Sequence, residues 1–175
     1  PSNVLVLNQG DKHIPKVIDF GVAKAIDAKL NAIMTQTQAQ HLVGTPAYMS
    51  PEQTGVTERG IDTRSDVYSL GVLLYELITG VTPIDSETQS RSSYEEMHRL
   101  IREATPPKPS TRLGLSDSSI EIAKHRHSQP RKLIQQVQGD LDWIVMKALE
   151  KDRERRYESV GALADDLQRY LTDAP

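Results

Sequence analysis

Asp19 is the first residue along the chain whose type and position indicate chemistry. It begins the tripeptide DFG at residues 19–21 and follows residues 16–18, KVI, a short run typical of a strand. A carboxylate at the end of a strand can bind Mg²⁺, the hard cation that neutralises the charge on a phosphate during its transfer. Three residues match by chance in many proteins, and an ordinary turn after a strand explains the tripeptide when it is taken alone.

A second motif is longer and therefore more specific, because residues 44–53 read GTPAYMSPEQ. In this order and at this separation, the two motifs resemble the two ends of the activation segment of a protein kinase. The resemblance implies that Thr45 lies in the loop that receives the protein substrate. It also implies that Glu52 pairs with a buried arginine late in the domain, where Arg156 matches and Arg155 is the neighbouring alternative. Without the resemblance, a surface glutamate and an arginine that caps a helix are the alternative.

A third stretch, residues 62–71, reads DTRSDVYSLG and resembles the start of the central helix of a kinase. The resemblance assigns to Asp66 a hydrogen bond to the backbone of the catalytic loop, which implies a buried carboxylate. The helix dipole alone also favours an acid near the start of a helix. That explanation accounts for the acid but not for the whole string.

The resemblance further implies a site for ATP and Mg²⁺. Asn3 matches the catalytic-loop asparagine that binds the second Mg²⁺ beside Asp19. Leu5 and Ile18 match positions on the adenine side of the nucleotide. In any other fold, Leu5 and Ile18 would be ordinary core residues.

The catalytic base is not expected within these residues. Pro1, Ser2 and Asn3 resemble the end of a kinase catalytic loop. The resemblance therefore places the aspartate that acts as the base upstream of Pro1.

Residues 27–41 are rich in Ala, Thr, Gln and Asn and have no sustained apolar period, which predicts a mobile loop. Thr35 and Thr37 lie in this loop as possible phosphorylation sites. A phosphate on either residue could bind an arginine and order the segment. Threonines that merely keep a loop soluble are the equal alternative.

The resemblance covers residues 1–171 and is to the larger lobe of protein kinases, especially the bacterial serine/threonine kinases of eukaryotic type. The sequence has no glycine-rich loop, no strand lysine and no His-Arg-Asp motif, so we expect a partial kinase domain from the end of the catalytic loop onward. The intact parent is expected to transfer the γ-phosphoryl group of ATP to Ser and Thr hydroxyls, and this chain alone is expected to be inactive. The implied partners are protein substrates and the missing N-lobe of the same polypeptide.

Two other functions are open. A non-catalytic pseudokinase-type module could bind a partner through a helix over residues 94–104, although Asp19 and Asn3 would then have no purpose. An unrelated helical interaction domain would not explain the ordered series of motifs.

Composition excludes several classes of protein. The 175 residues carry a net charge of -3 and include 26% charged side chains, and this overall balance favours neither nucleic acid nor a membrane surface as a partner. The absence of cysteine excludes disulfides and thiolate metal sites. No apolar run is long enough to span a bilayer. We therefore expect this segment to be cytoplasmic, although the parent could be anchored to a membrane elsewhere.

The expected fold is mainly α, as in a kinase-like C-lobe of the α+β class. A small β-hairpin over residues 4–18 and the activation segment should precede a helical bundle. At its centre we expect a helix over residues 67–78, because it is apolar on nearly all sides.

Three further helices are expected, over residues 94–104, 140–150 and 160–171. Trp143, on the second of these, is expected in the core. Residues 105–138 are rich in Ser, Pro, His and Arg, which predicts a surface insertion or long loop with at most one helix, near residues 120–125. Residues 172–175 are expected to be a tail.

Overall fold

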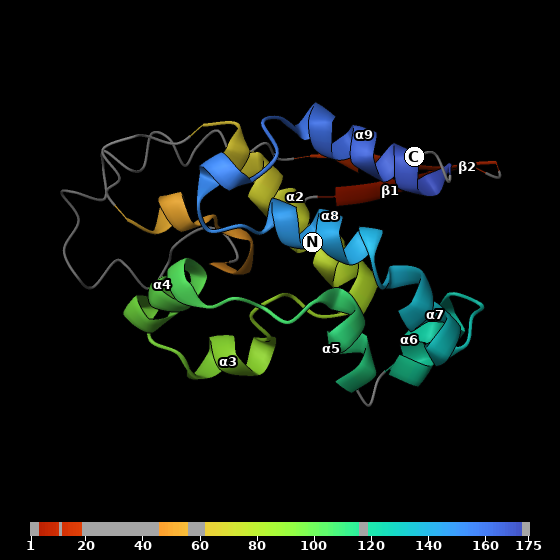
Figure 1. Ribbon diagram of the computed structural model, residues 1–175, viewed down its shortest axis with the longest axis horizontal. Coiled ribbons are helices and arrows are strands. Elements are labelled where there is room, and N and C mark those ends of the chain that lie inside the picture. Colours follow the sequence, from red (N-terminus) through yellow and green to blue (C-terminus); the bar gives the residue numbers. More distant parts are fainter. Residues whose placement is uncertain (1–3, 11, 19–45, 56–61, 116–118, 173–175) are drawn as a thin grey trace. The chain divides into compact units, whose positions relative to one another are not determined.

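The computed structural model describes residues 4–10, 12–18, 46–55, 62–115 and 119–172 (Figure 1). The chain divides into two compact units, residues 1–44 and residues 45–175. In the described part, no helix is both long and apolar enough to cross a membrane.

The described part of the first unit is a β-hairpin. Strands β1 (Val4–Gln9) and β2 (Lys12–Val17) pair antiparallel, with Val4 opposite Val17 and Gln9 opposite Lys12. Gly10 follows β1 with a φ of 62°, in the left-handed region that glycine adopts without strain. The predicted hairpin is therefore confirmed, and its strands extend further into the polar turn than the sequence indicated.

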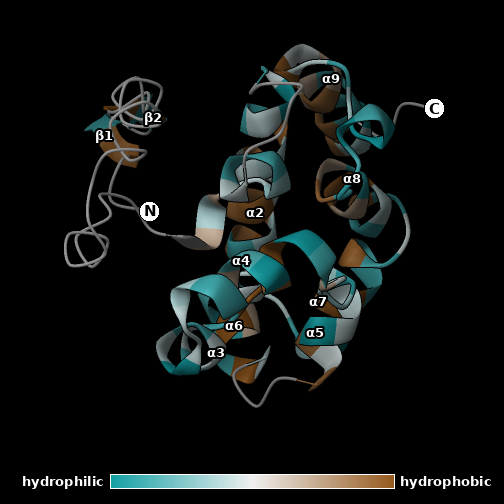
Figure 2. Ribbon diagram, turned by 90° about the vertical axis from the view of Figure 1, so that its left-hand side faces the viewer, coloured by the Kyte–Doolittle hydropathy of each residue, from teal (hydrophilic) through white to brown (hydrophobic). Residues whose placement is uncertain are grey.

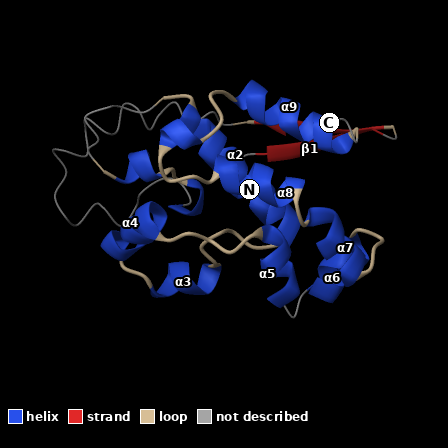
Figure 3. Ribbon diagram, viewed as in Figure 1, coloured by secondary structure: helices blue, strands red, loops and turns tan. Residues whose placement is uncertain are grey.

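The second unit is helical, and the protein is mainly α as predicted (Figure 3). Its α-helices are α2 (Arg64–Thr79), α3 (Ser86–Arg91), α4 (Tyr94–Glu103), α5 (Pro109–Leu115), α6 (Ser119–His125), α7 (Pro130–Val137), α8 (Asp140–Ala148) and α9 (Val160–Leu171). Among the described residues, the 3-10 helices η2 (Pro46–Tyr48) and η3 (Pro51–Thr54) precede α2, and η4 (Arg153–Arg155) lies between α8 and α9.

Helix α2 is the centre of this unit. It buries Val67, Val72 and Tyr75, and α8 and α9 pack against it (Figure 1). Figure 2 shows apolar residues on all three of these helices. The helix ends at Gly80, whose φ of 77° is left-handed and whose N–H donates to the carbonyl of Glu76. The predicted central helix is therefore present, although its side chains are not buried on every face.

Residues 105–138 differ from the prediction of a surface insertion or long loop. The described residues form three helices, α5, α6 and α7, whose inward side chains join the core next to α2 and α8; these are Leu113, Ala123, Leu133 and Val137. The backbone N–H of Ser110 donates to Asp142 Oδ1 at 2.9 Å, and Ser110 Oγ donates to Asp142 Oδ2 at 2.5 Å. This buried contact fixes the start of α5 on α8, so the segment is part of the folded core.

Candidate functional site

The site is built around a buried ion pair between Glu52 and Arg156. Glu52 lies in η3, and its Oε1 and Oε2 accept hydrogen bonds of 2.7 and 2.8 Å from Arg156 Nη1 and Nη2. Ser65 Oγ, in the first turn of α2, donates to Glu52 Oε1 at 2.6 Å. Two parallel bonds between a guanidinium and a carboxylate fix both position and orientation, so the pair holds η3 against the segment that contains Arg156.

Arg156 uses every N–H of its guanidinium in this site. Besides the Glu52 bonds, Nε donates to the carbonyl of Glu150 at 2.7 Å, Nη1 to that of Arg64 at 3.1 Å and Nη2 to that of Lys151 at 3.1 Å. A guanidinium has five donors in a fixed fork, and here all five are paired. One side chain therefore connects η3, the start of α2 and the segment after α8.

The electrostatics of Glu52 follow from these contacts. Burial opposes its charged form, but the hydrogen bonds from Arg156 and Ser65 outweigh burial and lower the pKa of Glu52 to about 2. The carboxylate is therefore ionised at neutral pH, and the pair is a buried salt bridge.

A second contact holds the other end of the same segment. The Tyr48 hydroxyl, in η2, donates to Glu76 Oε2 on α2, and Ser69 Oγ donates to the carbonyl of Tyr48 at 2.8 Å. Burial, together with the hydrogen bond to Glu76, raises the pKa of Tyr48 above its usual value. Sequence reasoning did not find this contact. The available signal was Glu76 itself, an acid within the apolar run of α2.

The connection between these contacts is short and locally ordered. Pro51 occupies the first position of η3, where its missing N–H costs nothing. The backbone N–H of Ser50 donates to Gln53 Oε1 at 2.8 Å, and Thr54 Oγ1 donates to the carbonyl of Pro51 at 2.7 Å. Residues 46–54 are thus supported by their own side chains as well as by α2 and Arg156.

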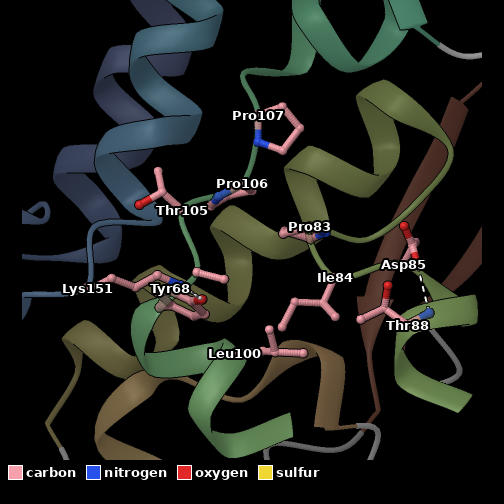
Figure 4. Close-up of a pocket in the computed structure, with 11 residues that line it drawn as sticks. Tyr68, Pro83, Ile84, Asp85, Thr88, Leu100, Thr105, Pro106, Pro107 and Lys151 are labelled. Atoms are coloured by element: carbon pink, nitrogen blue, oxygen red, sulfur yellow. Dashed lines mark hydrogen bonds between the residues drawn. The ribbon is translucent and has the colours of Figure 1, made fainter. Parts of the chain in front are cut away.

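Lys151 is a further polar group, partly buried, that the sequence did not single out. Its Nζ donates to the carbonyl of Ile101 at 2.7 Å and to the Tyr68 hydroxyl at 3.2 Å. It lines a cavity of about 160 Å³ together with Tyr68 and a mainly apolar wall of Pro83, Ile84, Leu100, Pro106 and Pro107 (Figure 4). Burial, and secondarily the charge of Arg156, lower the pKa of Lys151 to about 8.

The remaining residues indicated by the sequence are not brought together in the described structure. Asn3, Asp19, Thr35, Thr37 and Thr45 lie outside the described residues. Within the described ranges, no group of three or more His, Cys, Asp and Glu side chains could hold a metal ion.

The position of the catalytic base stays a prediction. Pro1, which was expected to follow the catalytic aspartate closely, also lies outside the described residues.

Three residues to which the sequence analysis assigned a role lie in the described part, and all three are exposed. They are Leu5 on β1, Ile18 directly after β2, and Asp66 on α2. The expectation of a buried carboxylate at Asp66 is therefore wrong for this structure. Its position in the first turn of α2 satisfies the helix dipole without burial.

Comparison with known proteins supports the family suggested by the motifs. The model of the protein kinase domain matches residues 1–167, so the match begins at Pro1 itself. The chain is 35% identical over 174 residues to the serine/threonine-protein kinase Pkn1 of Myxococcus xanthus, covering 99% of this chain and 20% of that protein. It is 34% identical over 177 residues to the serine/threonine-protein kinase PknB of Mycobacterium tuberculosis (strain H37Rv), covering 100% of this chain and 22% of that protein.

A third relative extends the comparison to another genus. The probable serine/threonine-protein kinase PknB of Bifidobacterium longum is 34% identical over 172 residues, which cover 98% of this chain and 20% of that protein. The chain thus spans about a fifth of the length of the curated relatives it matches. Because the family model matches nearly all of the sequence, the chain belongs to the protein kinase family.

Proposed function

We propose that this chain is part of a serine/threonine protein kinase, which transfers the γ-phosphoryl group of ATP to Ser and Thr hydroxyls of protein substrates. The observation that carries the proposal is the buried Glu52–Arg156 pair. It anchors the segment that directly follows Thr45, and Tyr48 bonded to Glu76 anchors the same segment a few residues earlier. Phosphoryl transfer depends on positioning, and a loop that receives a substrate needs a rigid base of this kind.

The metal and nucleotide roles are assigned to four residues. Asp19 and Asn3 would bind Mg²⁺, which supplies positive charge to the phosphates when it is bound. Leu5 and Ile18 would lie on the adenine side of ATP. This assignment is supported by the motifs and by the family to which the chain belongs.

Three further roles concern the substrate and the regulation of the kinase. Thr45 would contact the protein substrate next to the phosphoacceptor. Asp66 would hold the backbone of the catalytic loop, and its exposure leaves it free to do so. Thr35 and Thr37 would be phosphorylated in the active enzyme.

The 175 residues contain no His-Arg-Asp sequence. We therefore propose that transfer requires an N-lobe and a catalytic loop in addition to these residues, with the catalytic aspartate upstream of Pro1, and that the chain by itself is inactive. The region of kinase homology would be residues 1–171, followed by a short tail over residues 172–175.

The test is transfer of radiolabel from ATP to a generic protein substrate by the full-length protein. Asp19→Asn should abolish transfer, because the metal loses its charged ligand. Asp165→Asn, at an exposed position on α9, removes the same charge and should leave transfer unchanged. If Asp19→Asn transfers label as fast as the wild type, Asp19 is not a metal ligand. If the wild type transfers none, the non-catalytic interaction module is the better function.

The loop residues are tested in the same assay. Thr35→Ala combined with Thr37→Ala should lower activity if phosphorylation orders the loop. Mass spectrometry of active protein in which neither threonine is modified would contradict this role.

A further inference from the structure

The segment from α6 to α7 concentrates positive charge on a protein whose net charge is -3. Between Glu121 and Asp140 the sequence contains four Lys and Arg residues, two His and no acid. The four cations lie at the end of α6, in the following turn and in the first turn of α7, and all are exposed; they are Lys124, Arg126, Arg131 and Lys132. An excess of one sign in one place creates a local field that attracts the opposite charge.

Most described arginines elsewhere in the helical unit have an acidic partner, as in Arg91–Glu87 at 2.9 Å and Arg99–Glu96 at 2.7 Å. Arg102 is an exception, since its side chain donates to the hydroxyl of Thr54. Among the described residues, Lys124, Arg131 and Lys132 form no ion pair, and Arg126 donates only to a backbone carbonyl, that of Leu77. Glu121 is the one acid in the sequence from the start of α6 to the end of α7, against four cations, so the segment keeps a net positive charge.

Two aliphatic side chains protrude into solvent in the same part of the fold. Ile120 is 67% exposed and lies four residues before Lys124 on α6, so the two side chains share one face of that helix. Leu115 is 78% exposed and ends α5, which packs against α6. The side chains of α6 that face the core are Ala123 and the partly buried Ile122, so Ile120 is not needed for the core.

We propose that these six side chains form a peripheral binding surface for an anionic lipid bilayer. We call it the basic surface, and it comprises Leu115, Ile120, Lys124, Arg126, Arg131 and Lys132. The cations would bind phosphate or carboxylate groups of lipid heads, while Leu115 and Ile120 would enter the boundary between headgroups and acyl chains. The proposal concerns where the protein is held, and it is independent of phosphoryl transfer.

The chemistry of the surface favours lipid over nucleic acid. Single-stranded nucleic acids are bound by cations interleaved with aromatic side chains on which bases stack. Residues 105–138 contain no Phe, Tyr or Trp. Exposed aliphatic side chains beside the cations provide no ring on which a nucleobase could stack, whereas they add affinity for a bilayer.

The first test is sedimentation of the full chain with vesicles of phosphatidylcholine alone or mixed with phosphatidylglycerol. The wild type should bind only the mixed vesicles, and high salt should release it. The combined change Lys124→Gln, Arg131→Gln and Lys132→Gln should weaken binding roughly a hundredfold, since each cation near an anionic surface contributes about fivefold. Arg126 is left intact because of its contact with α2.

A control variant removes the same charge elsewhere. Arg91→Gln, Lys108→Gln and Arg155→Gln change three exposed cations outside the basic surface. If position matters, this variant should bind the mixed vesicles about as well as the wild type. Equal losses in both variants would overturn the proposal, because net charge alone would then explain binding.

A second pair of variants separates lipid from other anions. Leu115→Ser with Ile120→Ser should weaken vesicle binding, whereas Leu171→Ser, at a position 73% exposed on α9, should not. Absence of binding to the mixed vesicles would overturn the proposal. So would tighter binding to single-stranded DNA or to polyglutamate than to the vesicles, or an unchanged affinity when both aliphatic side chains are removed.

Discussion

Glu52 and Arg156 are 104 positions apart in the sequence, yet their side chains meet through two hydrogen bonds of 2.7 and 2.8 Å in the interior of the helical unit. The Tyr68 ring lies 5.0 Å from the Arg156 guanidinium carbon, within the range of a cation–π interaction. The pair therefore contributes to two things at once, the position of η3 and the packing around the start of α2.

Glu52→Ala should lower the free energy of unfolding by about 3–5 kcal/mol, because it leaves a buried guanidinium without its carboxylate. Urea denaturation measures the change. The double variant Glu52→Gln with Arg156→Met should recover part of the loss, since neither residue then buries an unpaired charge. Additive effects of the two single changes would show that the residues are not coupled. The exposed pair Glu87–Arg91 is the control, with a coupling of at most about 1 kcal/mol.

The same pair predicts how stability depends on pH. The pKa of Glu52 is about 2 in the folded state and near 4.5 when the residue is unpaired. Its stabilising effect is thus complete above pH 4.5 and is lost as the pH falls toward 2. Asp85, whose pKa is lowered to about 2 by its bonds to Thr88 and Arg112, contributes in the same window.

The comparison that isolates Glu52 is therefore wild type against Glu52→Gln. The free energy of unfolding should fall more steeply below pH 4.5 in the wild type than in the variant. Parallel pH profiles of the two proteins would contradict the assigned pKa.

The longer helices could be predicted because their apolar period lasts for about two and a half turns or more, as in α8 with nine residues. Helix α9 has the predicted bounds, Val160–Leu171, and α4 ends one residue before the predicted end. Helices α5 and α7 have only seven and eight residues. Each is too short to show a helical period of apolar residues between its polar neighbours. The core position of Leu113, on α5, could therefore not be recognised.

Burial within a helix was harder to predict than the helix itself. Trp143 was expected in the core and is 56% exposed. Its ring instead lies nearly perpendicular to the Tyr157 ring, with the centroids 6.3 Å apart, and the Lys147 ammonium lies 4.6 Å from the centroid of the Trp143 ring. A cation over a ring stabilises an aromatic residue at the surface, which hydrophobicity alone does not anticipate.

The contacts of the site were likewise predicted only in part. The Glu52–Arg156 contact was expected only because a family pattern linked two distant positions; no local spacing indicates it. The contacts of Tyr48 with Glu76 and of Lys151 with Tyr68 join residues far apart in the sequence and were missed. Such pairs depend on how helices pack, and a single sequence carries no direct record of that packing.

Lys151 predicts a second effect of pH, on the alkaline side. Its pKa is lowered from 10.5 to about 8 in the folded state, so the unfolded chain binds more protons between these values and stability should rise with pH. Lys151→Met should lack this rise, whereas Lys108→Met, at an exposed position, should keep it. Measurements should stay below pH 10, where the raised pKa of Tyr68 begins to act in the opposite direction. An identical slope in wild type and Lys151→Met would contradict the prediction.

The last prediction concerns the contact between α2 and α8. Gly71 lies where the helices approach so closely that an added Cβ would be 2.8 Å from the Cβ of Ala148 and 3.3 Å from its carbonyl carbon. The second neighbour is backbone, which cannot rotate away. Gly71→Ala should therefore destabilise the protein by about 1–3 kcal/mol, the usual cost of overpacking, despite the better helix propensity of alanine.

Two companion variants separate overpacking from helix propensity, with thermal unfolding as the measurement. Gly114→Ala, on α5, has no atom within 4 Å of the added Cβ, so only propensity acts and the change should be neutral or stabilising by up to about 1 kcal/mol. Ala148→Gly combined with Gly71→Ala removes the closest clash and should recover part of the loss, although the contact with the backbone of residue 148 persists. A melting temperature for Gly71→Ala at or above that of the wild type would show that α8 can move away from α2. The contact between α2 and α8 would then be more deformable than the short Gly71–Ala148 distances indicate.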